Sequence, residues 1–199
     1  MIIKNTGFVR NAKAKLTDMG ILEDRYKNEV VKKLMEEFKI KNPLAVPTIE
    51  KVVVNVGAGE ALKNKDLIES WAKDLAIITG QKPSIRKARI SVSAFGVRKG
   101  APVGLKCTLR GKRSWSFLDR LFSIVLPRLS DFRGVPLDSF DDEGNYTLGL
   151  SDFTVFPEVD ISKVNKPFGL EITIVTTTKD KEISKRFLEL LGMPFEKKG

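Results

Sequence analysis

Two segments of this chain alternate apolar and polar residues so regularly that they restrict the fold to a sheet with one buried face. Successive side chains of a strand point to opposite faces of its sheet. The apolar positions of segments 47–56 and 104–110 are Val52, Val54, Val56, Leu105, Cys107 and Leu109. The polar positions that would share the opposite face are Lys51, Asn55, Lys106, Thr108 and Arg110. One packed face and one open face are typical of antiparallel sheets, so we expect that architecture here.

Helical periodicity elsewhere supplies a layer that would cover the apolar face. Apolar residues recur there every three or four positions. The predicted helices lie at 22–38, 67–78, 117–125 and 183–191, and the further strands at 146–150 and 170–178. The order of elements predicts an α+β domain. It has an antiparallel or mixed sheet of about five strands, helices packed on one face, and an open polar, basic face.

The positive charge of the chain is concentrated in one stretch. Residues 75–118 contain ten basic residues and no carboxylate, whereas the remainder holds 25 of each sign, so this stretch carries the whole net charge of +10. Such a field attracts a polyanion, most often nucleic acid. A solvated basic face without a partner is the alternative, but such faces normally mix both signs. The ten are Lys82, Arg86, Lys87, Arg89, Arg98, Lys99, Lys106, Arg110, Lys112 and Arg113.

The length of 199 residues suits one domain, and we find no internal repeat and no interdomain linker. Residues 1–20 differ from the rest, because four cations precede the first acid, Asp18, and apolar periodicity is weak. We predict a basic N-terminal tail over 1–20, mobile or touching RNA, and a single RNA-binding domain over 21–199. A transit peptide is less favoured because serine enrichment is missing. No apolar run reaches the roughly 20 residues of a membrane-spanning helix.

The composition argues against an enzyme. Histidine is absent, which removes the commonest general base and metal ligand. The one cysteine, Cys107, cannot form an intrachain disulfide and suits a reducing compartment. Its place in the strand alternation predicts a buried core residue and not a reactive thiolate. The one acidic cluster is interpreted as a loop and not as a metal or acid/base site: Asp138, Asp141, Asp142 and Glu143.

Two rival functions are less favoured by the sequence. Gly57-Ala58-Gly59 follows a predicted strand and imitates a dinucleotide fingerprint, but Leu62 stands where the third glycine would be, so a tight turn is favoured. A basic module for anionic membranes would need an amphipathic helix with basic flanks, whereas the cations here lie mainly on predicted strands and a loop.

The segment from Lys87 to Val103 is a long glycine-rich, basic loop with one aromatic residue, Phe95, predicted to be exposed. Long ordered loops in compact domains are often functional. We expect this loop to project from the body and touch a second RNA. A flexible loop without a partner is the alternative.

Six motifs follow one another with the spacing of a known family. They are Val52-Val-Val-Asn-Val-Gly57, Ile78-Thr-Gly-Gln-Lys-Pro83, Thr108-Leu-Arg-Gly111, Leu126-Pro-Arg-Leu-Ser-Asp-Phe-Arg-Gly134, Gly144-Asn-Tyr-Thr-Leu-Gly149 and Leu191-Gly-Met-Pro-Phe195. From about Leu22 to Lys197 the chain therefore resembles the bacterial ribosomal protein five of the large subunit.

The resemblance implies a non-enzymatic protein of the central protuberance, in the cytoplasmic ribosome, without a cofactor. Its implied partners are 5S rRNA, large-subunit rRNA, the P-site tRNA and, across an intersubunit bridge, the small-subunit ribosomal protein thirteen. It implies no membrane and no small-molecule substrate.

The resemblance also implies site residues. The RNA-contacting sheet positions of the family fall on Asn55, Gln81, Thr108 and Arg110, of which Gln81 comes from the resemblance alone. Alternation adds Lys51 and Lys106 to this rRNA-binding set. The tRNA-reaching loop falls on 86–103, and its candidate contacts are Arg86, Lys87, Arg89, Phe95, Arg98 and Lys99.

Two departures from the family pattern stand out. Ala88-Arg89-Ile90 replaces the usual Ala-Lys-Lys, so the loop has one cation fewer. Asp142-Glu143 replaces the usual Gly-Arg before the Gly-Asn-Tyr motif, and this change of sign argues against a phosphate contact by that turn.

Overall fold

The computed structural model describes residues 21–59, 65–129, 132–164 and 166–196. Within these residues, five strands form one sheet in the order β2-β3-β1-β5-β4, and every neighbouring pair is antiparallel. The strands are β1 (Ile49–Gly57), β2 (Ser84–Lys87), β3 (Pro102–Leu109), β4 (Tyr146–Leu150) and β5 (Leu170–Thr176). The predicted α+β class is confirmed, with the antiparallel form of the sheet. The predicted tail, 1–20, lies outside the described residues.

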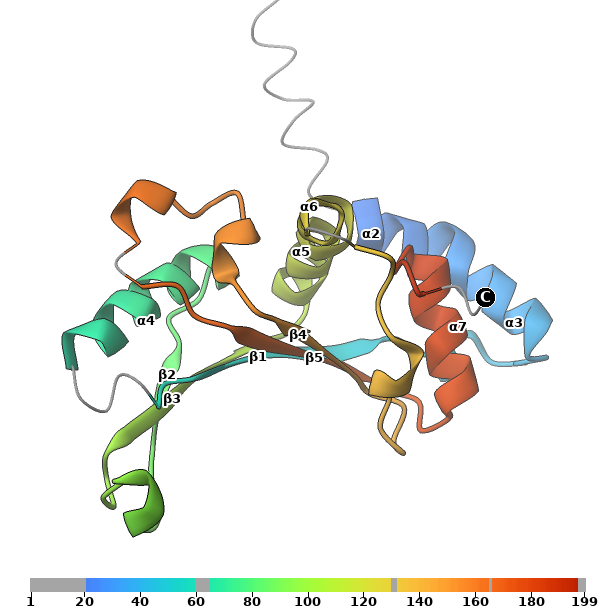
Figure 1. The fold of residues 1–199 in the computed structure, drawn as a ribbon. Coiled ribbons are helices and arrows are strands. Elements are labelled where there is room, and N and C mark those ends of the chain that lie inside the picture. Colours follow the sequence, from blue (N-terminus) through green and yellow to red (C-terminus); the bar gives the residue numbers. More distant parts are fainter. Residues whose placement is uncertain (1–20, 60–64, 130–131, 165, 197–199) are drawn as a thin grey trace, which may run out of the picture.

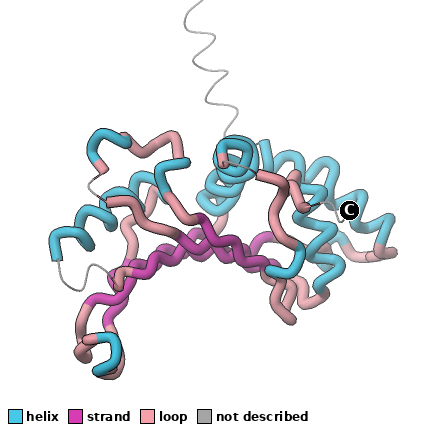
Figure 2. The backbone as a smooth tube through the Cα atoms, viewed as in Figure 1, coloured by secondary structure: helices cyan, strands magenta, loops and turns pink. Residues whose placement is uncertain are grey.

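The helices lie on one side of this sheet, as Figure 1 shows. They are α2 (Ile21–Arg25), α3 (Val31–Glu37), α4 (Lys65–Thr79), α5 (Lys112–Arg120), α6 (Leu126–Arg128) and α7 (Lys181–Leu191). Five-residue π-helical turns at Tyr26–Val30 and Leu121–Val125 make α2–α3 and α5–α6 continuous. In Figure 2 the strands form one band with the helices on one side, so the other face of the sheet is left open.

The hydrophobic core lies between the helices and the sheet. The six apolar strand positions predicted from alternation are each at most 1% exposed, so that prediction is confirmed. The helices contribute fully buried side chains to the same core, among them Leu34, Leu75, Phe117, Leu121 and Phe187. Burying one such side chain stabilises the fold by about 1.5–3 kcal/mol. A shift of one residue in the strand register would bring the polar side chains of β1 and β3 into the core. The burial of the apolar positions therefore fixes which strand residues remain on the open face.

Two boundaries differ from the sequence prediction. β3 begins at Pro102 and not at Gly104, because β2 pairs with the extra residues: Lys87 lies opposite Pro102. The helix that starts with α5 continues past Pro127 to Arg128. Pro127 is followed by a single further helical residue, so the N–H that it lacks interrupts only the final turn of this helix.

The C-terminal helix, α7, is capped at both ends. The side chain of Asp180 accepts hydrogen bonds from the backbone N–H groups of Glu182 and Ile183, which caps the first turn. Gly192 closes the helix in the left-handed region with φ of 103°, a conformation that costs glycine little. The predicted end of this helix is confirmed.

Candidate nucleic-acid interface

The strand register aligns the open-face residues in rows across the sheet. Asn55 of β1 lies opposite Lys106 of β3 on one side and Glu171 of β5 on the other, and Lys106 in turn lies opposite Ser84 of β2. The Asn55 side-chain amide donates to a Glu171 carboxylate oxygen at 3.3 Å. This row therefore changes from basic at β3 to acidic at β5, and the cationic half of the face is the half formed by β2 and β3.

A second row is neutral. Val53 of β1 lies between Thr108 of β3 and Thr173 of β5, and Thr173 lies opposite Thr147 of β4. The hydroxyl oxygens of Thr147 and Thr173 are 3.2 Å apart. Hydroxyl groups both donate and accept hydrogen bonds, so this row offers contacts to sugar and phosphate oxygens without adding charge.

Two predicted cations lie at the end of the face where β1 begins and β3 ends. Lys51 is half-buried, and its ammonium nitrogen lies 3.0 Å from a carboxylate oxygen of Glu50. Such a partly exposed ion pair contributes at most about 1 kcal/mol, so a phosphate oxygen can compete for the ammonium group. Arg110 directly follows β3 and is exposed. The polar strand positions are thus on the open side, as alternation predicts.

Gln81 is held against the edge of this face through its side-chain amide. Its nitrogen donates to the carbonyl oxygen of Thr108 at 3.3 Å, and its oxygen accepts from a guanidinium nitrogen of Arg113 at 3.2 Å. The resemblance alone had pointed to Gln81, and the structure brings it together with Thr108. Arg113 is not among the rRNA-binding residues predicted from the sequence, although it is one of the ten cations of the carboxylate-free stretch 75–118.

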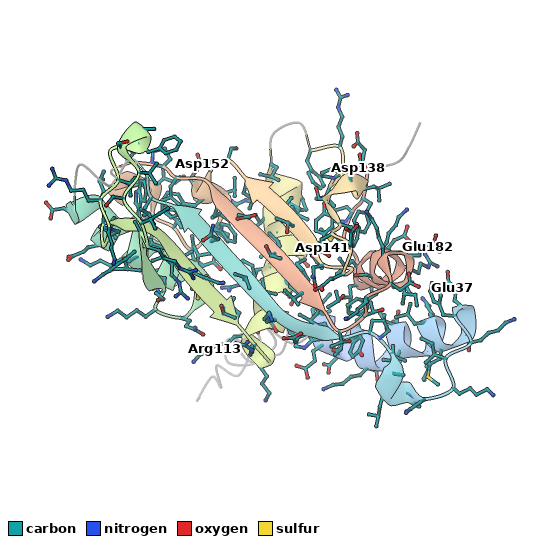
Figure 3. The ribbon with its side chains drawn as sticks, turned by 90° about the horizontal axis from the view of Figure 1, so that it is seen from below. Glu37, Arg113, Asp138, Asp141, Asp152 and Glu182 are labelled. Carbon is teal, nitrogen blue, oxygen red and sulfur yellow. The ribbon has the colours of Figure 1, made fainter. Side chains whose placement is uncertain are left out.

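Figure 3 looks onto the open face of the sheet. Arg113 lies at the end of β3, while Asp138, Asp141 and Glu182 gather around the far side, near β4 and α7. These three acids are therefore separated from the end of β3, where Arg113 lies. The cations of the carboxylate-free stretch belong to β2, β3, the loop between them and the residues after β3.

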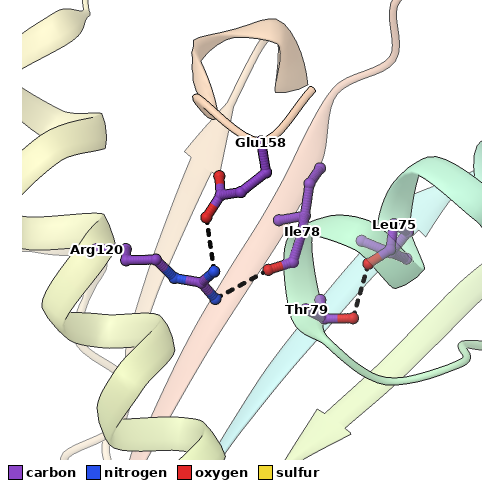
Figure 4. Close-up of polar contacts among 5 residues, drawn as sticks. All are labelled: Leu75, Ile78, Thr79, Arg120 and Glu158. Carbon is purple, nitrogen blue, oxygen red and sulfur yellow. Dashed lines mark hydrogen bonds and ion pairs between the residues drawn. The ribbon is translucent and has the colours of Figure 1, made fainter. Parts of the chain in front are cut away.

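Thr79 is the last residue of α4, two positions before Gln81. Its hydroxyl oxygen is 2.7 Å from the carbonyl oxygen of Leu75, within α4 (Figure 4), and 3.0 Å from the carbonyl oxygen of Gln81. The thiol of Cys107 points at the same hydroxyl oxygen at 3.5 Å. Burial raises the pKa of the Cys107 thiol, which favours the neutral thiol and confirms the interpretation as a core residue. Thr79 and Cys107 thus form a small buried polar network at one end of the hydrophobic core.

Arg120 fixes the end of α4 from the other side, as Figure 4 shows. One guanidinium nitrogen donates to Glu158 at 2.6 Å and another donates to the carbonyl oxygen of Ile78 at 3.0 Å. The second bond satisfies one of the carbonyl groups that every helix leaves without a partner at its C-terminus. Arg120 therefore connects α5, the loop around Glu158 and the helix end that leads directly into Gln81.

The predicted loop projects from the body of the molecule, below the sheet in Figure 1, so that part of the prediction is confirmed. Its arms are joined by backbone bonds: Val92 and Val97 exchange two, at 2.8 and 3.1 Å, and Ala88 donates to the carbonyl oxygen of Ala101 at 2.8 Å. A 3-10 turn (Ser93–Phe95) forms the tip. All six candidate contact residues of the loop are exposed: Arg86, Lys87, Arg89, Phe95, Arg98 and Lys99.

The acidic turn before β4 is a structural element. The Asp141 carboxylate accepts from the backbone N–H groups of Glu143 and Asn145 and from the Asn145 side chain. Burial opposes ionisation there, but these hydrogen bonds hold the pKa of Asp141 below its ordinary value. Among the residues that the structure describes, there is no group of three or more acidic or cysteine side chains able to hold a metal ion.

The dinucleotide alternative conflicts with the topology. β1 is antiparallel to both of its neighbours, β3 and β5, whereas the fingerprint needs a parallel βαβ unit. Leu62 lies outside the described residues, and α4 starts only at Lys65. Gly57 is the last residue of β1, and the Ala58 N–H still donates to the carbonyl oxygen of Val103 at 2.9 Å, so this segment continues along β3. Within the described parts of the chain, no helix is both long enough and apolar enough to cross a membrane.

Comparison with known proteins decides the family. The family model for ribosomal protein L5 matches residues 42–98, and the model for the C-terminus of the same ribosomal family matches residues 102–195. A curated protein of Dictyoglomus turgidum, "Large ribosomal subunit protein uL5", is 54% identical over 90% of this chain and 100% of its own length. The protein of the same name from Rubrobacter xylanophilus is 52% identical over 89% of this chain and 98% of its own length.

This chain belongs to the ribosomal protein L5 family. The resemblance stated from the six motifs is confirmed. Proteins of the L5 family are structural and non-enzymatic, so this chain is a structural constituent of the large ribosomal subunit, in the cytoplasmic ribosome. The two L5 models divide the chain within the projecting loop: the first covers β1, α4 and β2, and the second covers the chain from Pro102, the first residue of β3.

Proposed function

We propose that the chain binds 5S rRNA through the β2–β3 half of its open sheet face and helps to attach that RNA to the large subunit. The observation that carries the proposal is the register: it gathers Asn55, Lys106 and Thr108 on the face that the helices leave uncovered. Gln81 and Arg110 lie at the edge of the same half. This proposed rRNA-binding face combines cations with amide and hydroxyl groups.

The two kinds of side chain have different tasks in this proposal. Lys51, Lys106 and Arg110 neutralise phosphates, which supplies affinity that falls as salt rises. Asn55 and Thr108 hydrogen bond to sugar and phosphate oxygens, which fixes the position of the RNA. The absence of any carboxylate between 75 and 118 keeps the β2–β3 half free of repulsion against the RNA backbone.

Gln81 can contact RNA without losing its bonds within the protein. An amide side chain has two N–H donors and two acceptor lone pairs, and only one of each is used in the bonds to Thr108 and Arg113. Arg113 has further donors on its guanidinium group and can bind a phosphate while it orients Gln81. We therefore add Arg113 to the proposed rRNA-binding face.

The loop over 86–103 has a separate role in this proposal, which is contact with the P-site tRNA in the assembled ribosome. Its projection from the body of the molecule in Figure 1 and its exposed cations support that division. Contacts with large-subunit rRNA and a bridge to the small-subunit ribosomal protein thirteen complete the proposal. They rest on family membership, and we assign no described residue to them.

Filter binding across a salt series tests the proposal. Purified protein should prefer 5S rRNA over an unrelated structured RNA of equal length by about a thousandfold at physiological salt. The slope of log affinity against log salt should be about −0.7 to −0.9 for each phosphate neutralised. Equal and salt-sensitive binding to both RNAs would reduce the proposed rRNA-binding face to a merely basic surface.

A matched pair of variants locates the binding. Arg110→Ala should weaken 5S rRNA binding by about tenfold or more, because a charge-assisted bond is worth about 1.5–3 kcal/mol. Lys179→Ala, an exposed cation beyond the end of β5, should leave it nearly unchanged. Equal losses in the two variants would contradict a specific role for the face.

A further inference from the structure

The projecting loop carries an apolar surface that its cations do not explain. Phe95 is 78% exposed and Ile90 is 69% exposed, which is unusual for large apolar side chains on the same short loop. Beside them lies an open pocket of about 520 Å³. Its apolar lining comes almost entirely from the loop: Ala88, Ile90, Val92, Phe95, Val97 and Val103.

Hydrogen bonds of the backbone join the two arms of the loop that line the pocket. The paired bonds between Val92 and Val97 hold the two sides of the tip together. The amide of Lys99 donates to the hydroxyl of Ser91 at 2.9 Å, which joins the arms below the tip. Gly96, at φ of 63°, makes the left-handed turn that follows Phe95. An ordered apolar surface loses less entropy on binding than a flexible one.

The charges around the pocket indicate the kind of ligand. Arg89 lines the pocket itself, and the exposed cations Arg86, Lys87, Arg98 and Lys99 lie on the same loop. A partner must therefore present an apolar surface together with negative charge. RNA with an unstacked nucleotide has both, because each base has an apolar face and each linkage carries a phosphate. The charge complementarity thus favours a nucleotide in an RNA loop.

We propose that this pocket receives one unstacked RNA base, with Phe95 stacked on the base and Ile90 and Val97 beside it. The loop cations then hold the adjacent phosphates. Building on the proposed tRNA contact, this inference adds that the contact reads a base as well as the backbone. The base pocket, defined by Ala88, Ile90, Val92, Phe95, Val97 and Val103, would provide part of the affinity in a form that salt does not weaken.

The test uses ribosomes reconstituted with variants of the full chain and measures the dissociation constant of P-site tRNA over a salt series. Phe95→Ala should weaken binding by about 5- to 150-fold with an unchanged salt slope, since stacking is worth about 1–3 kcal/mol for each base. Phe95→Tyr keeps the ring and should bind nearly as well as the original chain. Arg98→Ala should instead lower the salt slope by about 0.7–0.9.

Further variants separate failure of this inference from failure of the proposed tRNA contact. A chain with the loop shortened by removal of 90–99 should lose tRNA affinity. If it does not, the tRNA contact itself is wrong. If the shortened loop weakens binding and Phe95→Ala does not, the base pocket is wrong and the loop binds the backbone alone. Binding to anionic lipid vesicles that requires Phe95, without an effect on tRNA, would likewise overturn the base pocket. Because Phe95 is exposed, its variants should unfold at the same temperature as the original chain.

Discussion

The sheet face and the projecting loop present similar cations on very different supports. Lys106 and Thr108 alternate along β3 with side chains that are at most 1% exposed, so the core holds that surface from beneath. Between Ser84 and Val103, by contrast, no residue is buried, and the loop depends on its own backbone bonds. A surface held by the core suits positioning of a stable RNA partner. A loop held only by itself suits contact with a partner that comes and goes, such as a tRNA.

The largest difference in stability between the two regions should appear when a cavity is made in the core beneath the sheet face. Leu105→Ala should lower the free energy of unfolding by about 2–5 kcal/mol, because Leu105 is fully buried. Ile90→Ala, on the exposed loop, should change it by less than about 0.5 kcal/mol. Urea unfolding measures both. Similar losses in the two variants would mean that the loop belongs to the same packed unit as the sheet.

A smaller loss of stability is expected when the hydrogen bond of Arg120 to the C-terminal end of α4 is removed. Arg120→Met should cost about 1–3 kcal/mol, because it leaves Glu158 and the carbonyl oxygen of Ile78 without this donor. Since that helix end leads into Gln81, 5S rRNA affinity should fall as well, while tRNA contact through the loop should not. Unfolding and filter binding on the same preparations check this. Unchanged 5S rRNA affinity would remove Arg120 as a positioning residue.

The hydroxyl of Thr79 offers a more local test of the support beneath the face. Thr79→Val keeps the shape and removes the bonds to Leu75 and Gln81, at a cost of about 0.5–1.5 kcal/mol in stability. We expect a few-fold loss of 5S rRNA affinity, which Thr79→Ser should restore. If the serine variant binds as weakly as the valine variant, the hydroxyl does not orient Gln81.

Thiol labelling compares how accessible the sheet and the loop are to a reagent in solution. In the native protein Cys107 should react only as fast as the sheet opens, because it is 1% exposed and burial raises its pKa, which keeps it a thiol at neutral pH. In a Cys107→Ala background, Ile90→Cys should react at the rate of a free thiol. Rapid labelling of Cys107 would show that the face is not held rigidly from beneath.

The sequence predicted those parts that depend on local periodicity. Alternation in residues 104–110 identified which side of β3 would be buried, and the carboxylate-free stretch located the cations. The place of Gln81 could not be predicted from the residues themselves, because its bonds reach Thr108 and Arg113, 27 and 32 positions away. The contact of Asn55 with Glu171 depends on the pairing of β1 with β5, which periodicity does not specify.

For the projecting loop, too, only part of the structure could be predicted from the sequence. Its length, glycines and cations predicted a projecting segment, and Phe95 was expected to be exposed. The base pocket could not be predicted, because it forms only when Val92 pairs with Val97 and brings the apolar residues of both arms to one side. Pairing within a loop is set by turn geometry that composition does not determine.

The division of tasks between the two surfaces is tested most directly by one titration of 5S rRNA against three proteins. They are the original chain, Arg110→Ala and the chain lacking 90–99 of the loop. We expect Arg110→Ala to lose about tenfold or more in affinity while the shortened chain binds 5S rRNA as the original does. A loss in the shortened chain as large as that in Arg110→Ala would contradict the division, because the loop would then be part of the 5S rRNA site.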